Sequence, residues 1–489
     1  MTYSHPSTAG NAVAYPATTT GQATDNTGPI AQPKRPRRWI ELGLLLAVTA
    51  ILALAVIAVE IAANHPLTTD VAYLLGGFII IFTVAHLVIL WKAPYSDQIM
   101  LPVAALLNAI GLVMIYRLDL ATGNNLVRSQ IMWTVIGVAM MVAVIVGLRD
   151  HRSLQDYSFL LGIAGLIFMA VPMVWPTSLN ADANVWVQIG PFSIQPGEFS
   201  KILLLLFFAS LLTTKRALFN VAGTKFLGMR FPRLRDLGPI LVVWGIALVI
   251  MAGENDFGPA LLLFGTVLGM LYIATSRPSW IIIGLGLAAI GAVGIYNISA
   301  KIQTRVDNFI DPMSHYNEGG YQLSQALFGL SWGGITGTGL GRGYPEEVPV
   351  AHSDFILAAI GEELGLVGLS ALIVLYAIFV TRGMKTALKT RDTYGKLVAS
   401  GLSLTIAIQV FVVVGGISRL LPMTGLTTPF VAHGGSSLLA NYMLLAIILR
   451  ISNSARQPAS VSGSAATPNR KTKNRKTNQQ ASTNQKEAQ

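Results

Sequence analysis

The sequence contains no cysteine, and charged residues make up only 12% of it. The first absence excludes disulfides and thiolate metal sites. The second is notable because soluble domains carry about 25% charged residues. Hydrophobic residues reach 53%, and the mean hydropathy is +0.58. The sequence therefore predicts an all-α membrane protein that crosses the bilayer many times.

Several other signals are also missing. Residues 1–33 have no compact apolar region near their start, so no cleavable signal peptide is expected. The glycine-dense stretch 328–343 follows no strand and precedes no Gly-Lys-Ser/Thr, which argues against nucleotide binding. No second half resembles the first, so an inverted-repeat transporter is not indicated. The net charge of +11 does not indicate nucleic-acid binding, because the basic residues flank apolar runs.

Twelve apolar runs are long enough, or nearly so, to cross a bilayer as helices, which requires about 17–25 residues. They are 39–62, 70–91, 100–117, 130–148, 156–175, 198–213, 238–253, 259–275, 279–298, 354–380, 396–415 and 435–452. Backbone groups in lipid find no partner outside the chain, so these runs predict a helix bundle.

The distribution of positive charge predicts the orientation. If the N-terminus lies in the cytoplasm, 27 of the 34 Lys and Arg residues fall on the cytoplasmic side. This asymmetry favours twelve spans with both termini inside the cell. The segments 1–38 and 453–489 are then cytoplasmic tails, which their composition predicts to be disordered. The segment 299–353 is the only large exterior element, and long ordered loops are often functional.

Asp256 lies in a short polar break between two apolar runs. Its position at a helix end on the outer face favours chemistry on an extracytoplasmic substrate over ion conduction. Glu254 lies two residues earlier, and in a loop the two carboxylates could converge. The alternative interpretation is structural, with Asp256 capping the helix that begins near Gly258.

Glu198 and Lys201 are three residues apart and share a helix face behind Pro196. They are interpreted either as an ion pair that lets both enter the bundle, or as a pair whose lysine also faces an anionic substrate. Asp354 opens the span that follows the long loop and could equally be a helix-dipole residue. Glu362 and Glu363 lie deeper in that span, so at least one of them must be paired.

Four ordered motifs resemble the SEDS family of cell-wall polymerases, which includes the RodA, FtsW and SpoVE proteins. The first runs from Asn184-x-Trp186 to Gln195-Pro-x-Glu198-x-x-Lys201, and the second is Asp256-x-Gly258. The third joins Gly-Gly-x-x-Gly-x-Gly-Leu-Gly to Pro349-x-Ala-His352-Ser-Asp354-Phe-Ile and Gly361-Glu-Glu-Leu-Gly365, and the fourth is Pro429-Phe430 with Gly434-Gly-Ser436-Ser437. The resemblance covers residues 97–452.

The resemblance implies a core of ten helices at 97–452, so the two helices of 39–96 are additional. Extended forms of this kind resemble RodA-like proteins of actinobacteria. The chain departs from the family where Glu254-Asn255-Asp256 replaces Gln-Pro-Asp and where Ala432-His433 replaces Ser-Tyr. The aspartate itself is retained.

The resemblance also implies an activity. The expected reaction polymerises lipid II into β-1,4-linked glycan strands at the outer face of the cytoplasmic membrane. Asp256 is the expected base, and the other predicted substrate contacts are Asn184, Trp186, Glu198, Lys201, Arg305, Arg342, His352, Asp354 and Ser436. The departing diphosphate would be held by Lys201, Arg305, Arg342 or a divalent cation such as Mg²⁺ or Mn²⁺.

The resemblance implies a class B penicillin-binding protein and the cell-elongation complex as partners. Four other functions stay open at this point: a lipid II flippase, a division polymerase, a proton-coupled transporter and a structural scaffold. Polar groups that cluster at the outer face favour an enzyme over a flippase. His86 and Glu60 are the candidate intramembrane groups of a transporter, although a lone helical histidine is usually structural.

Overall fold

The computed structural model describes residues 36–64, 66, 69–175, 185–190, 192–221, 223–226, 229–232, 234–254, 256–317 and 319–458. The longer helices are α1 (Trp39–Ala62), α2 (Thr69–Lys92), α3 (Met100–Thr122), α4 (Leu126–Gly147), α6 (Ser158–Val174), α7 (Gly197–Val221), α8 (Leu234–Gly253), α9 (Phe257–Thr275), α10 (Ser279–Ile298), α13 (Ile356–Lys389), α14 (Thr393–Ile417) and α15 (Gly435–Arg456). The shorter helices are α5 (Ser153–Asp156), α11 (Ala300–Ile310), α12 (Tyr321–Gly333) and the 3₁₀ turn η1 (Pro345–Glu347).

The helices confirm an all-α membrane bundle. Within the described ranges, ten helices are long and apolar enough to cross a membrane. Two shorter apolar helices, Ser158–Val174 and Leu241–Gly253, account for the remaining predicted spans. Short hairpins are the only sheets in the described part: β1 (Val187–Ile189) with β2 (Phe192–Ile194), and β3 (Gly223–Phe226) with β4 (Met229–Pro232).

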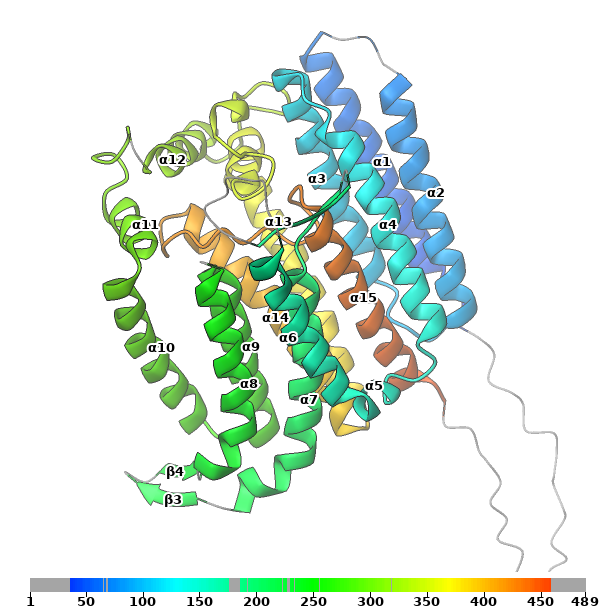
Figure 1. The fold of residues 1–489 in the computed structure, drawn as a ribbon. Helices are drawn as coiled ribbons and strands as arrows, with labels where there is room; N and C mark the ends of the chain where they lie inside the picture. The colour runs from blue at the N-terminus through cyan, green and yellow to red at the C-terminus, as the bar shows by residue number, and fades with distance from the viewer. Residues whose placement is uncertain are drawn as a thin grey trace, which may run out of the picture. The chain divides into compact units, whose positions relative to one another are not determined.

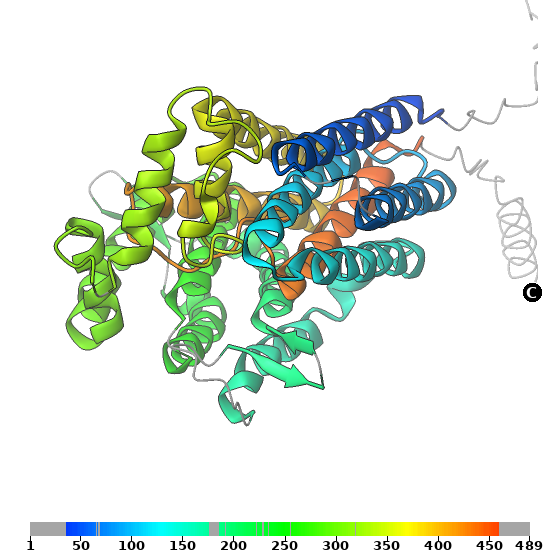
Figure 2. The ribbon, with the colours of Figure 1, turned by 90° about the horizontal axis from the view of Figure 1, so that it is seen from above.

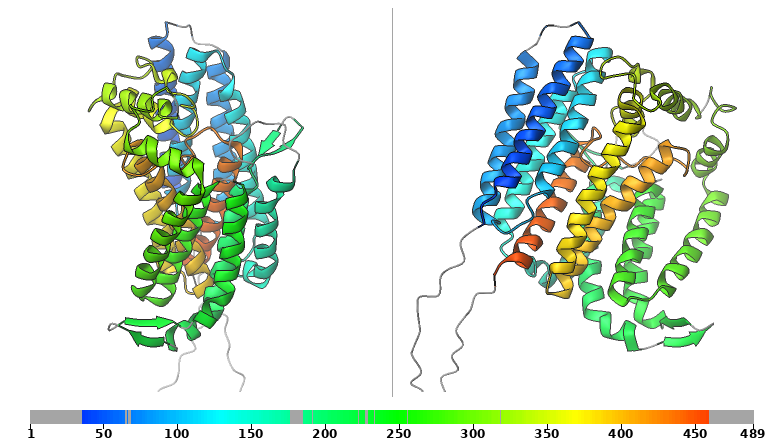
Figure 3. Two further views of the ribbon diagram at one scale, coloured as in Figure 1. Left: turned by 60° about the vertical axis from the view of Figure 1, so that its left-hand side comes forward. Right: turned by 180° about the vertical axis from the view of Figure 1, so that it is seen from behind.

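Successive spans run in alternate directions, so the connections gather at two ends of the bundle (Figure 1). The termini end carries residues 36–38, the connections at 93–99, 148–157 and 390–392, and the end of α15. The loop end carries the residues 63–64, 66, 185–190, 192–196, 254, 256, 299–317, 319–355 and 418–434, as Figure 3 shows from two further sides. Asp256 and the long loop therefore share one end, as predicted.

The core of the bundle lies around α3 and α15. In each of these two helices, 89% of the most apolar 18-residue stretch is buried. Helix α15 packs on α4 and α13, and α13 packs on α14 and α3. Helix α10 is the opposite case, because only 6% of its most apolar 18-residue stretch is buried. Its exposed side chains, which include Leu285, Ile290 and Val293, are those of a helix that faces lipid or a cavity.

The termini end is held together by paired charges. The buried Asp97 carboxylate accepts bonds from Arg382 at 2.8 Å and from Arg456 at 2.5 Å. Arg38 donates to the Ser96 carbonyl at 2.9 Å. Helix α15 continues to Arg456, four residues beyond the predicted end of this span at 452. The predicted helix ended with the apolar run, because the sequence does not reveal the ion pair between Arg456 and Asp97 at the end of the observed helix.

Three further helices extend beyond their predicted spans. Helix α3 continues past 117 to Thr122, because Arg117 pairs with Glu363 at 2.9 Å and Asp119 accepts from the Val127 amide at 2.7 Å. Helix α13 reaches Lys389 and α7 reaches Val221. The described residues of 299–353, the stretch predicted to be exterior, contain no span, as predicted, but they fold into α11, α12 and η1.

Candidate active site

Asp256 lies where α8 ends and α9 begins. Its backbone is extended, and its amide donates to the Met251 carbonyl at 3.0 Å. It occupies the N-cap position, and the nearby Gly258 amide helps to lower its pKa. A capping role for Asp256 therefore stays open beside a chemical one.

The environment of Asp256 suits proton transfer. The side chain is partly buried, and burial raises its pKa to about 6, against the opposing effect of the Arg305 and Lys301 cations. An acid of this strength is mostly ionised at neutral pH but is a better proton acceptor than an ordinary aspartate. The negative charge of Glu198 also raises the Asp256 pKa, so this glutamate lies within electrostatic range.

Glu254 is the second carboxylate of the site. Its side chain is buried, with 5% exposed, and its Oε1 has no hydrogen-bond partner within the described residues. Burial and the neighbouring Asp256 raise the Glu254 pKa to about 8. Glu254 is therefore protonated at neutral pH, and Asp256 carries the charge of the pair.

The segment 424–427 joins the two halves of the site. Arg305 of α11 donates to the Thr424 carbonyl at 3.3 Å. A Cβ on Gly258 would lie 2.8 Å from that same carbonyl oxygen, so the close approach of α9 requires glycine. The next residue, Gly425, lies between the Arg305 guanidinium and the Asp354 carboxylate, each within 4 Å of where its Cβ would be. Burial raises the Asp354 pKa as well.

The same segment reaches the predicted ion pair. Lys201 Nζ lies 2.7 Å from Glu198 Oε2, which confirms that the two residues pair on one face of α7. Lys201 also donates to Gln409 Oε1 at 3.3 Å, and Gln409 Nε2 donates to the Thr427 carbonyl at 2.7 Å. The lysine, the arginine and Asp256 are therefore linked through a few residues of one loop.

A large apolar cavity opens beside these groups. Its volume is about 570 Å³, and it is bounded by α8, α9, α10, α11 and residues 421–424. Its apolar lining includes Trp244, Phe264 and Leu287, whereas Arg305 supplies a cation. The cavity reaches Phe257 and Gly258, next to Asp256. The arrangement suits a ligand with a long apolar part and an anionic head.

The remaining predicted residues have different surroundings. Ser436 is buried and accepts from the Gln195 amide at 2.8 Å, which ties the β1–β2 hairpin to the start of α15. Trp186 is half-buried just before that hairpin, whereas Asn184 lies outside the described residues. The His352 ring stacks edge-on against His433, with the ring centres 5.6 Å apart. Burial lowers the pKa of both histidines, that of His433 to about 4.

Arg342 is exposed in the glycine-dense loop, and no contact in the described part joins its side chain to Asp256. Its role in substrate binding stays a prediction. The two buried glutamates of α13 are both satisfied, as expected: Glu363 pairs with Arg117, and Glu362 Oε1 accepts from the Tyr344 amide at 2.6 Å. These two carboxylates hold the loop in place.

The expectation of a divalent cation has no dedicated protein site. Within the described ranges, no group of three or more His, Asp or Glu side chains is arranged to hold a metal ion. Two carboxyl groups, those of Glu254 and Asp256, lie close together, and burial leaves one of them protonated. The side chains alone therefore do not form a metal centre, and a cation stays a prediction.

Sequence reasoning did not identify Gln409, Lys301 or the segment 424–427 as parts of the site. Gln409 could have been found, because it is a lone amide within an otherwise apolar span. The segment 424–427 had no such signal, since its contributions come from backbone carbonyls.

A polytopic helix bundle with a partly buried acid, two cations and an apolar cavity at one end defines a membrane protein built to act on an amphipathic anion. Comparison with known proteins identifies the family. The model of the FtsW/RodA/SpoVE family, described as "Cell cycle protein", matches residues 97–457. The chain belongs to this family.

Similar proteins agree with this membership. A Mycobacterium tuberculosis protein (strain ATCC 25618 / H37Rv) named "Peptidoglycan glycosyltransferase RodA" is 48% identical over 437 residues, which cover 88% of this chain and 93% of the relative. A Geobacter metallireducens protein named "Probable peptidoglycan glycosyltransferase FtsW" is 31% identical over 372 residues, or 73% of this chain and 94% of the relative.

Two solved structures share the fold. The Thermus thermophilus rod shape determining protein RodA aligns with a TM-score of 0.54 at 21% identity, over 74% of this chain and 98% of its own. A chain of a peptidoglycan synthase complex, described as coordinating polymerization and crosslinking, aligns with a TM-score of 0.61 at 23% identity, over 74% of this chain and 99% of its own. In both cases almost the whole solved chain aligns, and it covers about three quarters of this chain.

Proposed function

We propose that this protein is a peptidoglycan glycosyltransferase that polymerises lipid II into β-1,4-linked glycan strands. The observation that carries the proposal is the position of Asp256, a carboxylate with a pKa of about 6 beside an apolar cavity that contains Arg305. The activity in the names of relatives at 48% identity supports the same conclusion. The higher identity to RodA than to FtsW proteins favours a role in cell elongation.

The proposed mechanism is a single inverting displacement. The donor sugar is α-linked to a lipid diphosphate, and Asp256 accepts the proton of the acceptor hydroxyl as that oxygen attacks the anomeric carbon. The new β-glycosidic bond forms while the bond from the anomeric carbon to the phosphate oxygen breaks, and the lipid diphosphate leaves with the electron pair. Fixed positive charge near the departing phosphate stabilises this step.

Specific residues suit each part of that reaction. Arg305 lies between the cavity and Asp354, so it can hold a diphosphate while the lipid chain occupies the cavity. Lys201 is a second cation of the site, and Gln409 connects it to the segment 424–427 by hydrogen bonds. Glu254, when protonated, adds no competing negative charge near the diphosphate. Asp256 can then be the one ionised carboxylate of the pair.

We assign the termini end of the bundle to the cytoplasm. Basic side chains gather there, among them Arg38, Arg152, Arg382 and Arg456. The positive-inside rule then puts Asp256 and the long loop at the outer face of the cytoplasmic membrane. Lipid II would reach Asp256 laterally from the outer leaflet, so no nucleotide-driven step is required.

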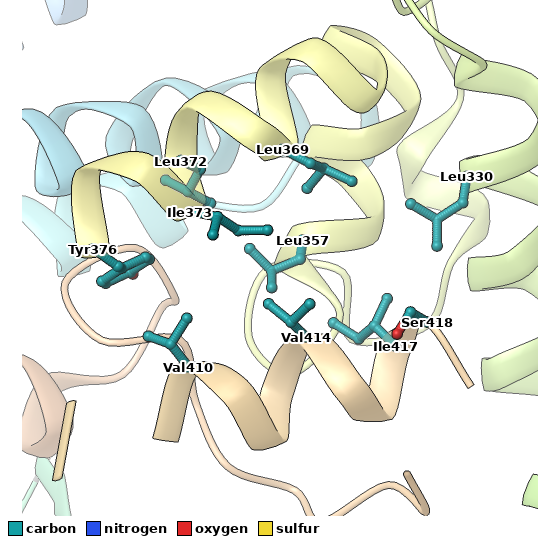
Figure 4. A pocket seen from close by; sticks show the side chains of 10 residues that line it. All are labelled: Leu330, Leu357, Leu369, Leu372, Ile373, Tyr376, Val410, Val414, Ile417 and Ser418. Atoms are coloured by element: carbon teal, nitrogen blue, oxygen red, sulfur yellow. The ribbon is translucent and has the colours of Figure 1, made fainter. Parts of the chain in front are cut away.

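A class B penicillin-binding protein is the proposed partner, and its membrane helix is the proposed occupant of a groove between α12, α13 and α14. Figure 4 shows apolar side chains of α13 and α14 facing each other, with Leu330 of α12 at one side. The space that they line has a volume of about 60 Å³. Ile373 lines this space and is 44% exposed, so it can contact a further helix. Exposed Phe328 and Trp332 of α12 extend the apolar surface beyond the groove.

The proposal is tested with purified protein, labelled lipid II and the partner, whose own cross-linking chemistry is blocked by penicillin. Long glycan strands are the expected product. Lipid II that crosses liposome membranes without forming any strands would instead assign the protein as a flippase.

A further inference from the structure

Helix α1 lies outside the part of the chain that the family model matches, yet it is firmly attached to that part. One face of the helix is buried along its whole length. The opposite face, which includes Leu46, Leu54 and Ile61, is exposed as expected for a helix that meets lipid. The buried face packs on α3 and α2.

At the loop end, α1 contacts the glycine-dense connection between α12 and α13. A Cβ on Gly341 would lie 2.7 Å from Ala62 Cβ and 3.5 Å from the Val59 carbonyl oxygen. Gly341 also has a φ of +78°, which L-residues rarely adopt. The buried Glu60 accepts a hydrogen bond from Tyr116 of α3. Figure 2, viewed from the loop end, shows α1 beside this connection.

The other side of the same connection is held by charged groups of α3 and α13. The Gly341 amide donates to Glu363 Oε2 at 3.0 Å. Arg117, which pairs with Glu363, also donates to the Gly343 carbonyl at 2.7 Å. The Thr338 amide donates to the Glu362 carbonyl at 3.0 Å. The loop therefore lies between α1 on one side and this buried ionic network on the other.

The far end of α1 is anchored independently. Arg38 pairs with the buried Glu41, and His86 of α2 lies 2.6 Å from the same glutamate. Arg38 also donates to the Pro94 carbonyl at 3.2 Å and to the Ser96 carbonyl at 2.9 Å. A helix fixed at both ends cannot move away from the loop without breaking buried polar contacts.

We propose that α1 positions the glycine-dense loop, with Val59, Glu60 and Ala62 as the positioning residues, and that the polymerase depends on this contact. The second half of the inference rests on the proposed function. The loop leads into Asp354, which lies beside Gly425 and within electrostatic range of Arg305. A displaced loop would therefore disturb the groups proposed to bind the diphosphate.

The first test enlarges the contact. Ala62→Leu places a bulky side chain against Gly341, whereas Ala58→Leu makes the same change on an exposed part of the same helix. We expect Ala62→Leu to speed hydrogen exchange in residues 334–347 and to lower kcat at least about fivefold. Thermal stability should match that of Ala58→Leu.

The second test uses the absence of cysteine from the chain. Ala62→Cys combined with Gly341→Cys should form a disulfide on mild oxidation, after a small separation of the two Cβ atoms to about 3.8 Å. Ala58→Cys with Gly341→Cys should not. Mass spectrometry of a digest detects the bond, and the oxidised protein should keep the activity of the reduced one.

The outcomes separate the two claims. Unchanged exchange in Ala62→Leu, or a disulfide that forms as readily in the 58–341 pair as in the 62–341 pair, would overturn the positioning role. Faster exchange with unchanged kcat would show that the loop is held but that catalysis does not depend on it, which overturns the second half of the inference. A wild-type protein that makes no glycan strands would refute the proposed function, while exchange and cross-linking would still decide what α1 does.

Discussion

The two ends of the bundle treat buried carboxylates differently. At the termini end, burial alone would raise the pKa of Asp97, but hydrogen bonds from Arg456 and Arg382 bring it below the ordinary value. Asp392 behaves likewise: burial would raise its pKa, but the hydrogen bonds from His151 and the Gly395 amide, together with the charges of His151 and Arg152, bring the pKa below the ordinary value. At the loop end, burial dominates, and the pKa values of Glu254, Asp256 and Asp354 are all raised.

This difference separates structure from chemistry. A carboxylate that is fully paired contributes to stability and has little capacity to accept a proton. A carboxylate that is desolvated without a close ion pair has a pKa that is raised toward neutral pH. Catalytic acids and bases are usually tuned in this way. The Arg305 and Lys301 cations lower the Asp256 pKa by their charge, but the effect of burial is larger.

The largest expected effect comes from replacing one aspartate at each end. Asp256→Asn should lower glycan polymerisation by about 10²–10⁴-fold, the usual contribution of a general base, without unfolding the protein. Asp392→Asn should keep normal kcat but lose stability, because it weakens the contact with His151 and the cap on Gly395. Strand length on gels and thermal unfolding in detergent measure the two effects. Full activity in a folded Asp256→Asn protein would contradict a catalytic role for Asp256, and the two ends would then not differ in chemistry.

A second variant tests the structural end alone. Asp97→Asn should lower stability by about 2 kcal/mol, since hydrogen bonds to charged groups contribute roughly 1.5–3 kcal/mol each. The kcat of the folded fraction should not change, because the α2–α3 connection that contains Asp97 lies at the opposite end of the bundle from the α8–α9 connection that contains Asp256. Thermal unfolding and activity are measured on the same preparation. Loss of kcat at unchanged stability would mean that the two ends are coupled.

The smallest expected effect concerns the partner. Ile373→Trp fills the groove between α13 and α14, whereas Val374→Trp places the same side chain on a neighbouring exposed position outside it. Stimulation by the penicillin-binding protein should fall roughly fivefold in Ile373→Trp, which corresponds to about 1 kcal/mol of docking energy. Basal polymerisation should be equal in both variants. Equal stimulation in both would place the partner elsewhere.

Much of the fold could be predicted from the sequence, because membrane-spanning helices leave a strong apolar signal. The first span was predicted at 39–62 and is observed there. Boundaries failed where charged residues continue a helix, as at Arg117 and Arg382, since their partners are more than 200 residues away in the chain. Asp256 was found because it interrupts an apolar pattern. Gly425 and Thr424 were missed because their contributions depend on backbone positions that only the folded chain brings together.

The most direct test of the account is the pH dependence of kcat/KM for wild-type protein. Asp256 accepts a proton only when it is ionised, so activity should be full above its folded pKa and fall as the pH drops through about 6. Because the Arg305 cation lowers the Asp256 pKa, Arg305→Gln should move this acid limb to higher pH. Ionisation of Glu254 near pH 8 should reduce activity on the alkaline side, and Glu254→Gln should remove that limb. An acid limb near pH 6 that moves upward in Arg305→Gln would support Asp256 as the base. Activity that stays constant down to pH 4.5, or a limb that Arg305→Gln leaves in place, would contradict it.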